Sequence, residues 1–184
     1  MKPTLVFAMK EEAQDVFDDY EVLFTGVGKV NAAYTLSKYL ANNKPSMILN
    51  LGTAGSRKHA GGSVVNPTQF VQRDMDVTAL GFEKYQTPFS NDPVKIDYGE
   101  RFVGLQAGVC GSGDDFATGE EANNFDCVDM EAYALSLICQ REDVAFASLK
   151  YISDGADDGA DVDWNEALKT AAQTLRKALE EAGL

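Results

Sequence analysis

Short apolar runs alternate with a helical pattern in the first third of the chain, and this alternation constrains the fold more than any other feature. The runs at Thr4–Met9, Glu21–Thr25 and Met47–Leu51 have the length and composition of buried strands. After the second run, the turn Gly26-Val27-Gly28 leads into Lys29–Leu40, whose apolar residues recur at helical spacing. Strand–helix–strand alternation is typical of α/β proteins with a substantially parallel sheet.

The rest of the chain continues this pattern with weaker signals. Further strands are predicted at Gly61–Arg73, broken at Asn66-Pro67, and at Arg101–Val109 and Val144–Ile152. Further helices are predicted at Glu11–Phe17, at Ala132–Arg141 with Cys127–Glu131 as its opening, and after an N-cap at Asp163. Loops are predicted at Gln86–Gly99 and Gly111–Gly119. No repeat or linker interrupts the series, so residues 1–184 are expected to form one α/β domain.

The acidic balance of the chain excludes several classes of partner. Its formal net charge of −13 repels phosphate backbones and anionic lipids, so neither nucleic acid nor a membrane is expected to bind. No apolar run approaches the ~20 residues that span a bilayer. The N-terminal segment MKPTLVFAMKEE is too short and too acidic for a signal peptide. Cys110, Cys127 and Cys139 are predicted to be reduced, mostly buried thiols of a cytoplasmic protein.

The sequence lacks the usual motifs for cofactors and metals. It contains neither G-x-G-x-x-G nor G-x-x-x-x-G-K-[ST], so no cofactor is expected. The single histidine, His59, cannot supply a zinc ligand set, and no metal is expected. His59 is interpreted as an uninvolved surface residue in a polar loop. The small-residue segment Gly52–Gly55 is either a turn against a ligand or a tight strand-to-helix corner.

Three carboxylates follow predicted strands and remain as candidate acid–base groups. Glu12 lies just after the first strand, Glu131 lies beside Met130, and Asp154 follows the last strand. Ligands of open α/β sheets bind at the carboxyl ends of the strands, so these side chains are expected to share a cleft. A buried carboxylic acid can donate a proton, and an ionised carboxylate can orient water.

Six segments of the chain, in order, resemble one known family. They are FAMKEE (Phe7–Glu12), TGVGKVNAA (Thr25–Ala33), NLGTAG (Asn50–Gly55), DVTALG (Asp76–Gly81), VDMEA (Val128–Ala132) and ISDGAD (Ile152–Asp157). Together they resemble the nucleoside phosphorylase/nucleosidase superfamily, and more closely its 5′-methylthioadenosine/S-adenosylhomocysteine nucleosidases. The resemblance implies a three-layer domain in which helices flank a central mixed, largely parallel sheet.

The resemblance also implies roles for individual residues. Asp154 matches the catalytic acid that protonates N7 of the purine and holds its 6-amino group. Glu12 matches the carboxylate that positions or activates the attacking water. The remaining matches are substrate-binding residues: Met130 and Glu131 at the ribose, Thr53 near the ribose and water, Ala54 and Gly55 beside the base, Phe116 and Ala117 at adenine, Met9 at the ribose and 5′ group, and Lys150 and Ser153 close to Asp154.

Three positions depart from the family pattern. Lys150 stands where these nucleosidases usually carry an arginine, and an ammonium cannot reproduce the fork of donors of a guanidinium. Thr53 adds a methyl group at a position that is usually serine. The chain is also shorter than is usual for the family, and the missing part falls between about Gln86 and Val103. That part covers the 5′ pocket in longer relatives, so the choice of 5′ substituent stays open.

The expected activity is hydrolysis of the N-glycosidic bond of an adenine nucleoside, 5′-methylthioadenosine or S-adenosylhomocysteine. One alternative is a purine nucleoside phosphorylase, although Lys10-Glu11-Glu12 at the first strand end disfavours an anion. A second alternative is a catalytically weak nucleoside-binding protein. The resemblance further implies a homodimer, for which the sequence offers only the apolar segment Val77–Phe82.

Overall fold

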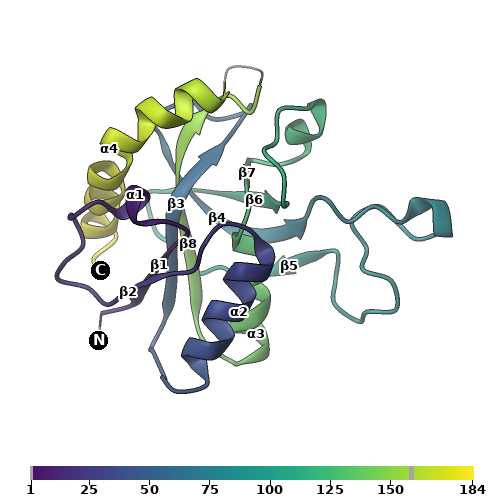
Figure 1. Ribbon diagram of the computed structural model, residues 1–184, viewed down its shortest axis with the longest axis horizontal. Helices are drawn as coiled ribbons and strands as arrows, with labels where there is room; N and C mark the ends of the chain where they lie inside the picture. The colour runs from purple at the N-terminus through teal and green to yellow at the C-terminus, as the bar shows by residue number, and fades with distance from the viewer. Residues whose placement is uncertain (1, 158–159) are drawn as a thin grey trace.

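The buried apolar segments of the sequence form the strands of one mixed sheet, and amphipathic segments form the helices around it (Figure 1). The computed structural model describes residues 2–157 and 160–184. The strands are β1 (Thr4–Phe7), β2 (Val22–Phe24), β3 (Ile48–Gly55), β4 (Val64–Gln72), β5 (Lys95–Asp97), β6 (Gln106–Ser112), β7 (Cys127–Asp129) and β8 (Phe146–Asp154). The helices are α1 (Lys10–Ala13), α2 (Lys29–Leu40), α3 (Ala132–Arg141) and α4 (Ala160–Glu181), with short 3₁₀ turns at Thr78–Leu80 and Glu120–Asn124.

The sheet is mixed and largely parallel, and part of it closes on itself. The strands β2, β1, β3 and β8 pair in parallel, as do β4, β6 and β7. Antiparallel pairs join β8 to β4, β4 to β5, and β7 to the last residue of β3. The five strands β3, β8, β4, β6 and β7 therefore form a ring, to which β1 and β2 add an open edge. This ring brings the carboxyl ends of β3, β7 and β8 to one place.

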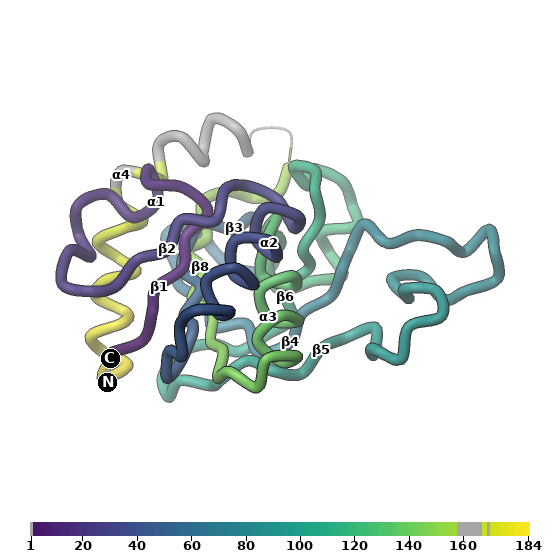
Figure 2. Tube along the Cα trace, turned by 60° about the horizontal axis from the view of Figure 1, so that its bottom comes forward, coloured from purple at the N-terminus to yellow at the C-terminus, as the bar shows by residue number. Residues whose placement is uncertain are grey.

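The two larger of three hydrophobic clusters among the described residues lie on opposite faces of the sheet. Alternate residues of β1 divide between them: Val6 belongs to the core under α2 and α3, whereas Leu5 and Phe7 belong to the core under α1 and α4. Leu135 of α3 and Leu175 of α4 are fully buried in the respective cores. The helices thus cover opposite faces (Figures 1 and 2). The predicted three-layer α/β fold with a mixed, largely parallel sheet is confirmed.

Several predicted boundaries are wrong for identifiable reasons. The strand β3 continues through Gly52–Gly55, which is neither a turn nor a corner. The strand β4 is continuous across Asn66-Pro67 and absorbs the proline as a shift in its register with β6. Cys127–Asp129 forms β7 instead of the opening of a helix, because it completes the ring between β6 and β3.

Three more differences lie near the middle and end of the chain. The short strand β5 forms within the predicted loop Gln86–Gly99, on the edge of β4. The strand β6 lies at Gln106–Ser112, further along the chain than the predicted Arg101–Val109, and so takes in the start of the predicted loop. The helix α4 begins at Ala160, and the cap predicted at Asp163 concerns a side chain outside the described ones.

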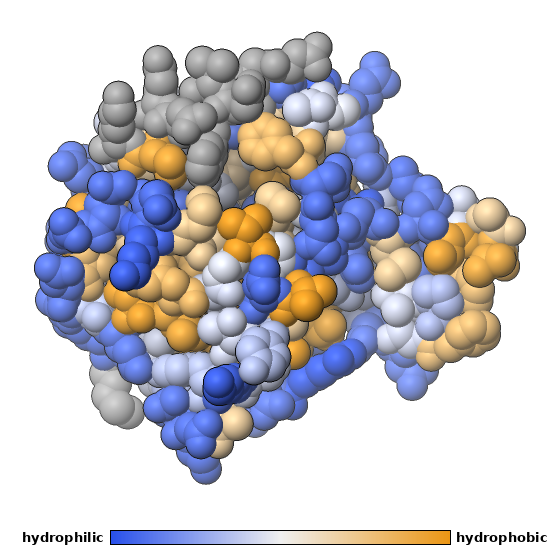
Figure 3. All heavy atoms as spheres, in the orientation of Figure 1, coloured by the Kyte–Doolittle hydropathy of each residue, from blue (hydrophilic) through white to orange (hydrophobic). Residues whose placement is uncertain are grey.

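The segment between β4 and β5 projects away from the rest of the molecule (Figures 1 and 2). Its tip exposes apolar side chains, with Leu80 73% and Phe89 95% exposed. The rings of Phe82 and Phe89 meet edge to face, with centroids 5.3 Å apart. Apolar surface gathers on this projection in the space-filling view (Figure 3). Among residues 2–157 and 160–184, no helix has both the length and the apolar character that a membrane span requires.

Candidate active site

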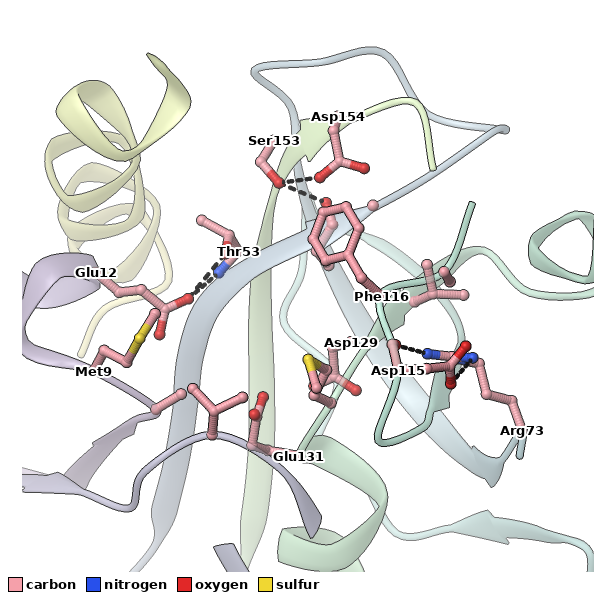
Figure 4. A pocket seen from close by; sticks show the side chains of 17 residues that line it. Met9, Glu12, Thr53, Arg73, Asp115, Phe116, Asp129, Glu131, Ser153 and Asp154 are labelled. Atoms are coloured by element: carbon pink, nitrogen blue, oxygen red, sulfur yellow. Dashed lines mark hydrogen bonds and ion pairs between the residues drawn. The ribbon is translucent and has the colours of Figure 1, made fainter. Parts of the chain in front are cut away.

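A cavity of about 420 Å³ opens at the carboxyl ends of β1, β3, β7 and β8 (Figure 4). All the candidate site residues named from the sequence line it, with the exception of Lys150. His59 is not among the described residues that line it. The topology explains the gathering, because β1, β3 and β8 run parallel and end at the same edge of the sheet.

Glu12 is fixed against β3. It lies in α1, directly after β1, and is only 5% exposed. Its Oε1 accepts hydrogen bonds from the backbone N–H and the hydroxyl of Thr53, both at 2.9 Å. Its Oε2 is buried without a hydrogen-bond partner among the described residues. A buried carboxylate oxygen of this kind in a cavity wall is suited to accept a hydrogen bond from a water molecule.

Asp154 is fixed at the end of β8. It is 7% exposed, and its Oδ1 accepts a hydrogen bond from the N–H of Ala156 at 2.9 Å. The hydroxyl of Ser153 lies 2.6 Å from Oδ2 and 3.3 Å from the carbonyl oxygen of Ala54. Ser153 therefore links the carboxyl group to the neighbouring strand β3. The side chain of Asp154 points into the same cavity as Glu12 (Figure 4).

Two glycines of β3 make room for these two carboxyl groups. A Cβ on Gly52 would lie 3.0 Å from Oε1 of Glu12, and a Cβ on Gly55 would lie 2.6 Å from Oδ1 of Asp154. Glycine allows a close approach of another group to a strand backbone. The small residues that looked like a turn in the sequence therefore keep β3 extended while both carboxyl groups pack against it.

Glu131 lies where β7 leads into α3, and is only 7% exposed. Its Oε1 accepts a hydrogen bond from the N–H of Gly28 at 2.8 Å. Burial, reinforced by the neighbouring carboxylate of Asp129, raises the pKa of Glu131 to about 8, although Lys150 and the Gly28 N–H oppose this. At neutral pH Glu131 is therefore mostly protonated in this structure.

Lys150 lies behind the cavity wall. Its ammonium is 2% exposed and is 2.8 Å from Oδ2 of Asp129, which also accepts the N–H of Ala132 at 2.9 Å. Burial opposes ionisation of both partners, but Lys150 holds the pKa of Asp129 below its usual value, and Asp129 raises that of Lys150. The hydroxyl of Ser112 donates to Oδ1 of Asp129. Lys150 thus contacts the cavity through Asp129.

Sequence reasoning missed several lining residues: Ala8, Val27, Arg73, Asp115, Val128 and Asp129. Asp129 precedes the Met-Glu pair, so its place at a strand end was a usable signal. Arg73 and Asp115 are 42 residues apart in the sequence and meet only in the fold, at 2.8 Å between Nη1 and Oδ1. No local pattern indicates such a pair.

Comparisons with known proteins agree with this arrangement. The model of the phosphorylase superfamily matches residues 21–182. The chain belongs to the phosphorylase superfamily. A 5′-methylthioadenosine/S-adenosylhomocysteine nucleosidase of Haemophilus influenzae is 31% identical over 189 residues, which cover 92% of this chain and 81% of the relative. The resemblance read from the sequence motifs is thereby confirmed.

Solved structures of superfamily members share the fold along nearly the whole chain. A 5′-methylthioadenosine/S-adenosylhomocysteine nucleosidase of Neisseria meningitidis, in complex with methylthio-immucillin-A, is 25% identical with a TM-score of 0.85, covering 97% of this chain and 96% of that one. The futalosine hydrolase of Helicobacter pylori is 23% identical with a TM-score of 0.86, covering 97% and 95%. At that identity the second likeness concerns the fold alone.

Proposed function

We propose that this protein is a nucleosidase that hydrolyses the N-glycosidic bond of an adenine nucleoside. The expected substrates are 5′-methylthioadenosine and S-adenosylhomocysteine, and the products are adenine and the 5-substituted ribose. One observation carries the proposal: Glu12 and Asp154, both buried, line a single cavity at the two ends of the segment Gly52–Gly55. The nucleosidases among the relatives support the same reaction.

Asp154 is proposed as the general acid at the base. As the bond between C1′ and N9 breaks, its electrons move onto the purine, and a proton from Asp154 to N7 neutralises the developing charge. Such proton transfer typically contributes ~10²–10⁴-fold to the rate. The contacts with Ser153 and Ala156 fix the carboxyl group. This fixed position suits directional proton transfer to a base held by Phe116 and Ala117.

Glu12 is proposed to position the nucleophile. Its Oε1 is engaged by Thr53, whereas its buried Oε2 remains able to accept a hydrogen bond. A water molecule held by Oε2 attacks C1′ on the face opposite the base, and its proton passes to Glu12. Met9, Met130 and Glu131 line the part of the cavity assigned to the ribose.

Water is favoured over phosphate as the nucleophile because the cavity offers little to an anion. At the N-terminus of α2, two backbone N–H groups already donate to protein carboxyl groups. Gly28 donates to Glu131 at 2.8 Å, and Lys29 donates to Asp114 at 2.7 Å. The guanidinium of Arg73 is paired with Asp115. A phosphorylase would need such groups for phosphate.

The test is adenine release from 5′-methylthioadenosine, measured with and without phosphate. The expected products are adenine and free 5-methylthioribose in both buffers. Formation of the sugar 1-phosphate as the main product would establish the phosphorylase alternative instead. Binding of the nucleoside without any release of adenine would establish the alternative of a catalytically weak binding protein.

A homodimer is proposed on separate grounds. The projecting segment, which includes Val77–Phe82, exposes Leu80 and Phe89 at its tip, and isolated apolar projections of this kind are suited to contact another chain. Light scattering at micromolar concentration should give twice the 19.9 kDa of one chain. A mass of one chain would refute the dimer. Location in the cytoplasm stays a prediction from the sequence.

A further inference from the structure

The loop that carries Phe116 has little packing of its own. Phe116 borders the cavity, yet the residue is 48% exposed. The preceding residues Asp114 and Asp115 have side chains that are 46% and 65% exposed. A half-exposed aromatic residue on a polar loop is not fixed by burial alone, so other contacts must define where its ring lies.

Arg73 binds this loop at Asp115, the residue before Phe116. Its side chain, directly after β4, is 4% exposed. Nη1 donates to Oδ1 of Asp115 at 2.8 Å, and Nη2 donates to the main-chain carbonyl oxygen of the same residue. The planar guanidinium thereby holds both the side chain and the backbone of Asp115, which a single ammonium cannot do. Figure 4 shows this contact on the loop that carries Phe116.

Gly113 brings the guanidinium close to the loop. A Cβ on Gly113 would lie 2.7 Å from Cζ of Arg73 and 3.0 Å from its Nε. The guanidinium therefore packs directly against the loop backbone. The Nε of Arg73 is buried without a hydrogen-bond partner among the described residues, a cost that the two contacts with Asp115 must offset.

A second ion pair holds the other carboxylate of the loop from a different side. Nζ of Lys29 lies 3.0 Å from Asp114 and 2.5 Å from Asp74, and the N–H of Asp114 donates to Asp74 at 2.9 Å. This group of residues does not line the cavity, whereas Arg73 and Asp115 do. Arg57 binds the far end of the loop, where its Nη2 donates to the carbonyl oxygen of Thr118 at 2.9 Å. Of these three cations, Arg73 is the one that lines the cavity.

We propose that Arg73 is a positioning residue that holds Phe116 against the base of the nucleoside through Asp115. The inference rests on the proposed function, since it needs a base in the cavity. Arg73 makes no described contact with Glu12 or Asp154, which are placed at the reacting bond. Loss of the contact between Arg73 and Asp115 should therefore weaken binding of the ground state and the transition state equally. Such a change raises KM and leaves kcat unchanged.

The experiment compares Arg73→Met and Arg73→Lys with the wild type, using 5′-methylthioadenosine kinetics and adenine binding by calorimetry. In Arg73→Met, KM should rise about tenfold, near the lower part of what base–aromatic stacking contributes. The value of kcat should stay within about twofold. Adenine affinity should fall in parallel with the rise in KM. Arg73→Lys keeps the buried positive charge but loses the paired N–H donors of the guanidinium. The KM of this variant should therefore also rise.

The control is Arg141→Met, which removes another arginine–aspartate pair, Arg141–Asp92 at 2.7 Å, away from the cavity. Its KM should equal that of the wild type. If Arg73→Met folds, an unchanged KM or a loss of kcat alone would overturn the inference. If Arg73→Met does not fold, an unchanged KM in Arg73→Lys would overturn it. A wild type that neither cleaves the nucleoside nor binds adenine would refute the proposed function and this inference together.

Discussion

The wall of the cavity formed by β3 and β8 is buried and tied to the main chain, whereas the wall formed by the loop of Phe116 is half exposed and held by ion pairs. Glu12 and Asp154 are 5% and 7% exposed, and backbone N–H groups bind both carboxyl groups. Phe116 is 48% exposed, and Arg73 binds the residue before it, Asp115.

This difference separates two tasks. Groups proposed to act on the glycosidic bond are held by the sheet, where small displacements are resisted by close packing. Groups proposed to hold the base lie on a loop, which can change without disturbing the sheet. Substitutions in the β3–β8 wall should therefore lower kcat, and substitutions in the loop wall should raise KM.

The largest effect is expected from Asp154→Asn. The variant keeps an oxygen that can accept the N–H of Ala156 but cannot donate a carboxyl proton to the purine. Loss of a general acid should lower kcat by about 10²-fold or more. Adenine release gives kcat, and circular dichroism reports whether the fold is intact. Near-normal turnover in a folded variant would show that Asp154 is not the general acid.

Gly55→Ala tests the β3–β8 wall without touching a carboxyl group. The added methyl group would lie 2.6 Å from Oδ1 of Asp154, so the side chain must shift. We expect kcat to fall about tenfold or more, because a misplacement of ~1 Å can cost ~10²-fold. The matched control is Gly119→Ala, where nothing lies within 4 Å of the new Cβ and kcat should not change. Equal activity of the two variants would contradict the tight fit at β3.

The sequence predicts lining residues in both walls, including Phe116 and Ala117 of the loop, but not the contacts that hold the loop. The strand-end positions of Glu12, Glu131 and Asp154 follow from local patterns, because parallel strands end at one edge of a sheet. The family motifs supplied the neighbouring residues Met9, Met130 and Ser153, which also line the cavity. The roles assigned to these residues stay predictions.

The remaining features depend on contacts between distant segments. The pair of Arg73 and Asp115 and the pair of Lys150 and Asp129 form only after β4, β6, β7 and β8 assemble. Cys127–Asp129 is a strand because two neighbours pair with it, a fact that its three residues cannot signal. Gly52–Gly55 stays extended because it pairs with β8, and Gly52 and Gly55 leave room for the carboxyl groups of Glu12 and Asp154.

Glu131 lies between the two walls, and its pH dependence sharpens the comparison. An acid whose pKa is raised to about 8 is neutral below that pH and ionised above it. The hydroxyl groups of ribose donate best to the ionised carboxylate, so kcat/KM should rise roughly tenfold from pH 6.5 to pH 8. Burial raises this pKa most, Asp129 and Glu12 raise it further, and Lys150 and the N–H of Gly28 lower it. Glu131→Gln should be less active, and its kcat/KM should not rise between pH 6.5 and pH 8. If kcat/KM still rises in this variant, another group is responsible for the pH dependence.

The smallest effect is expected at the 5′ end of the nucleoside, on the exposed rim of the cavity. Val27, which lines the cavity, is 40% exposed, and the segment between β4 and β5 projects away from the rest of the molecule (Figures 1 and 2). Enclosure of one methylene is worth about 10–200-fold in kcat/KM, so partial loss of cover should reduce the preference for 5′-methylthioadenosine over adenosine to roughly tenfold or less.

The measurement is kcat/KM for adenosine, 5′-methylthioadenosine and S-adenosylhomocysteine, side by side. Because the three share base and ribose, their contacts with Phe116, Glu131 and Asp154 cancel in the ratios, and only the 5′ group is compared. A preference of roughly a thousandfold for the methylthio compound would exceed what an open rim can give. It would require that apolar residues of the projecting segment, such as Phe82 or Phe89, close over the 5′ group. Phe89→Ala would then reduce that preference while adenosine cleavage stayed the same, since adenosine has no methylthio group to enclose.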